Sequence, residues 1–186
     1  MTLLIIGVAL FAAVHLVPGL APGRRQALWD RLGEGGYKGL FSLLLISAIA
    51  LMVMGWRSST PQFIYFPPPE LRHPGMGLVV LALLLFVVSG RPSRLRRLIR
   101  HPQLTGVAIW AGAHLLLNGD SRSIILFGGL GLWALLEILV INRRDGVWIK
   151  EDAPGWGTEV ATLVATAVVV AVLIYVHPWI AGVPII

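Results

Sequence analysis

The chain has 186 residues, of which 56% are hydrophobic and only 13% are charged, and its mean hydropathy is +0.81. A soluble domain of this length carries about 25% charged residues, so the composition excludes the ordinary soluble classes and favours one transmembrane domain over residues 1–186. The absence of cysteine excludes disulfides, thiolate haem ligands and iron–sulfur clusters.

Six apolar runs predict an all-α, polytopic bundle of about six transmembrane helices. The third and fourth runs would form only about 24 Å of helix against a hydrocarbon core of about 30 Å, so we expect them inside the bundle or where the bilayer thins. The first run has no Lys or Arg before it, which favours a span over a secretion signal. The six runs are residues 2–20, 39–56, 75–90, 103–118, 123–141 and 158–176.

The basic residues between the runs predict the orientation of the bundle. Twelve of the 15 Lys and Arg residues fall in the first, third and fifth connections, and three fall in the second and fourth. The positive-inside rule places the odd-numbered connections in the cytoplasm and both termini on the outer, periplasmic side. The same clusters explain the net charge of +6 through topology and contact with anionic membrane lipids, so we expect no nucleic-acid partner.

The first and fourth spans each carry one histidine. His15 stands one turn before Pro18, where the helix is expected to kink or end. His114 shares a helical face with Trp110 and Asn118. Two neutral imidazoles on different helices are what a buried haem b needs for its iron. The alternative is that each histidine is a hydrogen-bonded structural residue.

Four further ionisable residues near or within the spans remain without an assigned role. Glu137, in the fifth span, is interpreted as reaching toward Arg143 or Arg144, although it could also serve a ligating histidine or a proton relay. The others are expected to lie at wet membrane boundaries: His73, His101 and His177.

Three segments resemble the NnrU family of bacterial membrane proteins. They are residues 15–43, which include DRLGEGGYKGLFSL; residues 100–120, RHPQLTGVAIWAGAHLLLNGD; and residues 127–138, FGGLGLWALLEI. The family is related to plastid zeta-carotene isomerase, in which two histidines hold a haem b that isomerises a cis double bond of a polyene. The resemblance implies that these ligands correspond to His15 and His114. The chain departs from that enzyme where AHL-LLNGD replaces AHT-LWIGN, so the resemblance extends to the ligands and not to the polyene site.

The resemblance implies a haem b protein of the bacterial cytoplasmic (inner) membrane. It would act either in redox-linked isomerisation of a lipophilic polyene or in nitrite and nitric oxide metabolism during denitrification. Arg24 and Arg25 are expected to pair with the haem propionates. One alternative is a non-catalytic factor that assists a nitrogen-oxide respiratory complex. Another is a membrane methyltransferase, suggested by RHP before a span but lacking the paired acidic motif of those enzymes.

Overall fold

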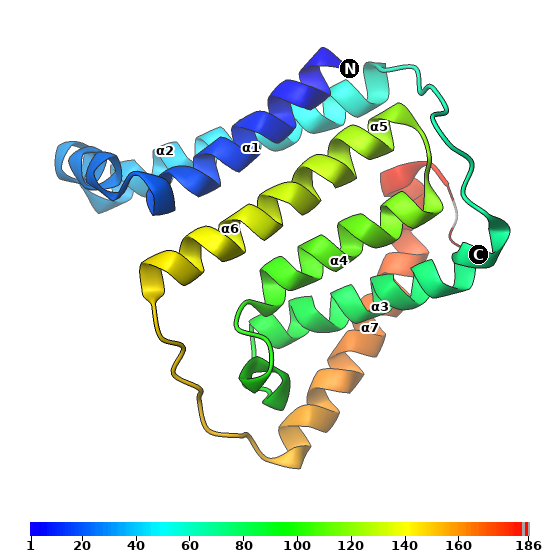
Figure 1. Ribbon diagram of the computed structural model, residues 1–186. Coiled ribbons are helices and arrows are strands. Elements are labelled where there is room, and N and C mark those ends of the chain that lie inside the picture. Colours follow the sequence, from blue (N-terminus) through cyan, green and yellow to red (C-terminus); the bar gives the residue numbers. More distant parts are fainter. Residues whose placement is uncertain (184, 186) are drawn as a thin grey trace.

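The computed structural model describes residues 1–183 and 185, and within these residues it consists of helices and loops, with one isolated β-bridge between Phe63 and Asp120. The all-α prediction is confirmed. Six longer helices are joined by four short helical segments (Figure 1). The longer ones are α1 (Thr2–Leu20), α2 (Pro22–Ser58), α3 (Arg72–Ser89), α4 (Pro102–Leu117), α6 (Gly129–Asp145) and α7 (Trp156–Ala181), and the short ones are η1 (Pro69–Leu71), η2 (Arg94–Arg97), α5 (Ser121–Ser123) and the π-helical η3 (Ile124–Gly128).

Among the described residues, five helical segments are long and apolar enough to cross a membrane, so the chain is a multi-pass membrane protein. They are Thr2–Leu20, Pro22–Ser58, Pro69–Ser89, Ser121–Asp145 and Trp156–Ala181. The remaining helix, α4, has 16 residues, which is about 24 Å of helix. It contacts α3 on one side and α6 on the other. A short helix flanked in this way agrees with the expectation that the fourth run lies inside the bundle.

The second predicted span begins much earlier than its apolar run. Helix α2 starts at Pro22, where proline suits the first helical turn, and continues through the basic segment that the sequence predicted as a loop. Its one interruption is Gly33, whose φ of 69° and ψ of 175° are not helical. Only glycine adopts such a conformation readily, so α2 bends there before it enters the membrane-spanning part.

Small residues bring α1 and α2 into close contact. A Cβ added at Gly55 would lie 2.7 Å from the Cα of Leu4, and one added at Gly7 would lie 2.7 Å from the backbone nitrogen of Met52. Backbones that approach this closely are typical of membrane helices that pack through small residues. Leu4, Val8 and Met52 form the buried cluster beside these contacts.

Helix α6 lies between α1 and α4. A Cβ added at Gly129 would lie 3.7 Å from the Cβ of Val8 on α1, and one added at Gly131 would lie 3.0 Å from the Cβ of Ala111 on α4. Two residues of helix correspond to a rotation of about 200°, so these contacts are on opposite faces of α6. Across the molecule the helices therefore follow the order α2, α1, α6, α4, α3 and α7 (Figure 1).

The three basic connections lie at one end of the bundle, opposite the end that holds both termini (Figure 1). Two of them are joined directly, since Arg100 donates to the carbonyl of Gly146 at 2.8 Å and Arg96 pairs with Glu151 at 3.3 Å. This arrangement is what the distribution of Lys and Arg predicts for cytoplasmic connections.

Candidate functional site

His15 lies in an aromatic environment made by α1, α2 and α6. Its Nδ1 donates to the carbonyl of Phe11 at 2.9 Å. Its ring centroid is 4.3 Å from that of Phe11, 4.8 Å from that of Trp133 and 5.7 Å from that of Phe41. Because a neutral imidazole carries one proton, donation through Nδ1 leaves Nε2 as a free acceptor.

His114 repeats this arrangement on the other side of α6. Its Nδ1 donates to the carbonyl of Trp110 at 2.9 Å, and its ring stacks on Phe127 with centroids 4.3 Å apart. The Trp110 ring is 4.8 Å away. Asn118 uses its side-chain amide to donate to the backbone carbonyl of His114 at 2.9 Å, so it closes the end of α4. Trp110 and Asn118 therefore both accompany His114, as the helical spacing predicted.

The two histidines occupy different depths along α6. Val8 opposes Gly129, and Gly19 opposes Val140, so α1 runs parallel to α6 and His15 is level with residue 136. Ala111 opposes Gly131, and the His101 ring is 3.0 Å from Asn142, so α4 runs antiparallel and His114 is level with residue 128. Eight residues of helix separate these levels by about 12 Å.

These two imidazoles do not fit the axial positions of one haem iron. Axial histidines need α-carbons roughly 12 Å apart, one on each face of the macrocycle. Here the two histidines already differ by about 12 Å in depth along α6. In addition, α6 lies between α1 and α4 and separates their axes by about 16–20 Å. The expectation that His15 and His114 share an iron is therefore not supported by this arrangement, which places them in two separate sites.

Glu137 and Trp133 are buried polar residues one helical turn apart on α6. Glu137 is 9% exposed and Trp133 is 7% exposed. Within the described residues, the Oε2 of Glu137 and the Nε1 of Trp133 have no hydrogen-bond partner. The sequence-based interpretation of Glu137 as a partner of Arg143 or Arg144 differs from the structure, where Arg144 pairs with Asp145 at 2.7 Å. Unpaired buried polar atoms are rare, so these two mark a position suited to a ligand or an ordered water.

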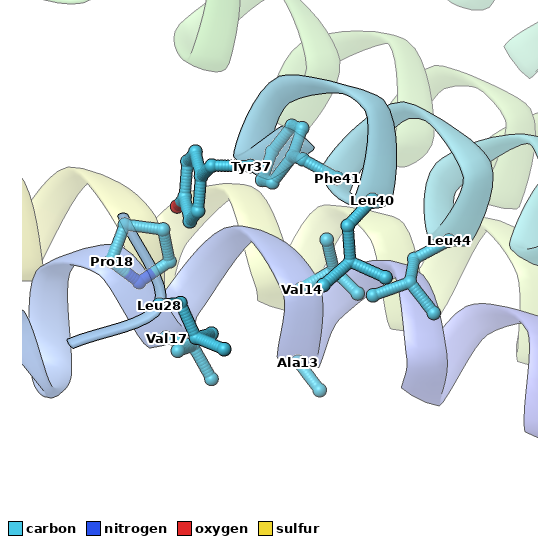
Figure 2. Close-up of a pocket in the computed structure, with 9 residues that line it drawn as sticks. All are labelled: Ala13, Val14, Val17, Pro18, Leu28, Tyr37, Leu40, Phe41 and Leu44. Carbon is cyan, nitrogen blue, oxygen red and sulfur yellow. The ribbon is translucent and has the colours of Figure 1, made fainter. Parts of the chain in front are cut away.

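An apolar pocket of about 170 Å³ lies between α1 and α2 on the side of His15 (Figure 2). Phe41 connects the two features, because it lines the pocket and also contacts the His15 ring. The Tyr37 hydroxyl is the polar group of the lining. The lining residues are Ala13, Val14, Val17, Pro18, Leu28, Tyr37, Leu40, Phe41 and Leu44.

Of the two arginines predicted to bind a cofactor, Arg25 lies closer to this pocket. Its guanidinium is 5.5 Å from the ring of Trp29 and 6.0 Å from that of Tyr37. Arg24 is an exposed neighbour in the first turn of α2. Both arginines stand on the α1–α2 side of the bundle, whereas His114 lies across α6, so they accompany the His15 site alone.

The NGD part of the family signature has structural roles. The carbonyl of Gly119 accepts from the amides of Ile64 and Tyr65 at 2.8 and 3.1 Å, which attaches the connection before η1 to the end of α4. Asp120 caps α5 by accepting from the amides of Arg122 and Ser123 at 2.9 and 3.2 Å. Burial opposes ionisation of Asp120, but hydrogen bonds from Ser123 and Arg122 outweigh it and lower the pKa of this carboxyl. The cap is therefore an ionised carboxylate at a helix N-terminus.

The other histidines take separate positions. His73 is exposed at the start of α3, and His101 contacts Asn142. The Nδ1 of His177 donates to the carbonyl of Val183 at 2.7 Å. The residues that sequence reasoning missed are aromatic: Phe41, Phe127 and Trp133. Their only signal in the sequence was an aromatic ring within an apolar run, which is common in any membrane helix.

Comparison with known proteins identifies the family. The profile of the family described as NnrU protein matches residues 3–185. No curated protein and no solved structure matches the chain. Because the match covers nearly every residue, the chain belongs to the NnrU protein family.

Proposed function

We propose that this protein binds a lipophilic, chain-like molecule of the polyene class in the pocket between α1 and α2, beside His15. The observation that carries the proposal is the position of Phe41, which lines the apolar pocket and also contacts the His15 ring. The protein would lie in the bacterial cytoplasmic membrane, with α4 as the sixth span and both termini in the periplasm.

The lining of the pocket sets the chemical class of its ligand. Eight of the nine lining residues are aliphatic or phenylalanine, and the ninth is Tyr37. At about 170 Å³ the pocket is smaller than the 300–1,000 Å³ of typical ligand sites, so it suits a segment of a hydrocarbon chain whose remainder stays in the bilayer. Arg25, next to Tyr37, supplies a cation for an acidic end group.

His15 supplies the hydrogen-bonding group of this site. Its free Nε2 can accept a hydrogen bond, and Trp133, whose ring it contacts, carries an unpaired Nε1–H. Glu137 adds a carboxyl one turn further along α6. The proposal assigns no step to a haem held jointly by His15 and His114.

Filling the pocket should reduce labelling by a photoreactive lipophile. The probe is a conjugated fatty acid that carries a diazirine, added to membranes containing the protein and located by peptide mass spectrometry. Wild-type protein should be labelled within residues 37–44. Ala13→Phe places a ring in the pocket and should reduce that label by about tenfold, the ratio expected for losing about 1.4 kcal/mol of binding.

The matched control is Ala50→Phe, an exposed position of α2 outside the pocket lining, which should be labelled like the wild type. Equal labelling in both variants, or label spread evenly over α1 and α2, would refute the pocket. The remaining function would then be the non-catalytic one, a membrane factor that assists a nitrogen-oxide respiratory complex.

A further inference from the structure

A second pocket, of about 310 Å³, lies at the end of the bundle that carries the basic connections. It is lined by Arg94, Arg97, Leu98 and Lys150. Three of these four residues are cations, and none of them forms an ion pair with a carboxylate in the described part of the chain. A concave surface with three cations outside any ion pair is suited to an anionic group.

The pocket is built from two connections that other contacts hold in place. The carboxylate of Glu159 accepts from the Arg94 amide at 2.7 Å and from the Ser93 hydroxyl at 3.0 Å. The Arg94 guanidinium lies 4.3 Å from the centre of the Trp156 ring. These contacts fix the start of α7 against η2, so the pocket belongs to a defined junction between two parts of the chain.

Exposed apolar side chains occur in the same two connections and at the start of α7. Leu98 is 75% exposed, Val147 89%, Ile149 88% and Trp156 71%. Water is a poor environment for such side chains, whereas the glycerol and upper acyl region of a bilayer suits them. The combination of exposed apolar residues and unpaired cations matches the boundary between lipid headgroup and acyl chain.

We propose that this pocket binds the headgroup of an anionic membrane phospholipid that carries two phosphates, of the diphosphatidylglycerol type. The three cations and the neighbouring Glu159 carboxylate sum to a charge of +2, which two phosphodiesters of −1 each would neutralise. The acyl chains of the lipid would contact Leu98 and Ile149. The site lies across the bundle from the α1–α2 pocket and does not depend on the function proposed for that pocket.

Native mass spectrometry of the full chain released from nanodiscs tests this site. The triple variant Arg94→Gln, Arg97→Gln and Lys150→Gln should retain less bound diphosphatidylglycerol than the wild type. Each Lys or Arg that contacts an anionic headgroup contributes about fivefold in affinity, so the three together correspond to a loss of about a hundredfold. Arg97→Gln alone removes a side chain with no hydrogen bond to any described residue and should lower retention by about fivefold without disturbing the fold.

The control removes the same charge from another cytoplasmic connection: Arg24→Gln, Arg31→Gln and Lys38→Gln. Its retention should stay close to that of the wild type. In nanodiscs of phosphatidylglycerol or phosphatidylcholine, the wild type should retain fewer lipids than with diphosphatidylglycerol. Equal losses in the two triple variants, an unchanged Arg97→Gln, or equal retention of the three lipids would each overturn the proposal.

Discussion

Replacing Gly55 by alanine is expected to destabilise the protein by about 2 kcal/mol, through the interface between α1 and α2. The added Cβ would lie 2.7 Å from the Cα of Leu4 and 2.8 Å from its Cβ. Overpacking of this kind costs about 3 kcal/mol, and the higher helix propensity of alanine offsets about 1 kcal/mol. The neighbouring atoms include backbone, which cannot move aside by changing a rotamer, so α1 must separate from α2.

Unfolding in mixed detergent micelles, followed by circular dichroism against the mole fraction of dodecyl sulfate, measures this change. Gly39→Ala is the matched control, because Gly39 lies in the same helix and an added Cβ there meets nothing within 4 Å. That variant should be stabilised by up to about 1 kcal/mol. If Gly55→Ala were as stable as Gly39→Ala, the close contact of α1 with α2 would be wrong.

Gly119→Ala is expected to detach the connection before η1 from the end of α4, at a cost of about 3 kcal/mol. The added Cβ would lie 2.7 Å from the carbonyl carbon of Tyr65 and closer still to its oxygen. The backbone of Tyr65 cannot withdraw without losing the hydrogen bonds that Ile64 and Tyr65 donate to the Gly119 carbonyl. Steric repulsion and loss of these bonds therefore act together.

Hydrogen exchange at the amides of Ile64 and Tyr65 reports this event directly. A local loss of about 3 kcal/mol corresponds to roughly a hundredfold faster exchange. Gly112→Ala in α4, where an added Cβ meets nothing within 4 Å, should leave both amides as protected as in the wild type. Unchanged protection in Gly119→Ala would show that the NGD segment does not hold this connection.

Hydropathy and charge predicted the helices well, because a membrane imposes a length and a composition on each of them. The sequence located α4 as a short helix and placed the basic connections together. It missed the early start of α2 at Pro22, because the charged segment from Arg24 to Lys38 lacks an apolar run and only helix propensity supports it. Hydropathy indicates which residues lie in lipid, but it does not predict that a helix continues into water.

Depth and residue type identified His15 and His114 as unusual, and the structure gives each the same hydrogen bond to a carbonyl. Each also has an aromatic neighbour, Trp133 on α6 for His15 and Phe127 on η3 for His114. Whether the two histidines lie in one site depends on which helices are neighbours, and a hydropathy pattern does not predict this. The contacts of Gly129 and Gly131 show it, because they place α1 and α4 on opposite faces of α6. In the same way, only the packing showed that Glu137 is buried and that Arg144 pairs with Asp145 instead.

The most direct test of the central claim, that α6 separates His15 from His114, is cysteine cross-linking in native membranes. The chain has no cysteine, so introduced pairs can be read without background. A Cβ at Gly129 would lie 3.7 Å from that of Val8, which is within the usual range for a disulfide. Under mild oxidation, Val8→Cys with Gly129→Cys should cross-link, and so should Ala111→Cys with Gly131→Cys, while Val8→Cys with Ala111→Cys should not. Efficient cross-linking of that last pair, with failure of the first two, would contradict the account and return the two histidines to one site.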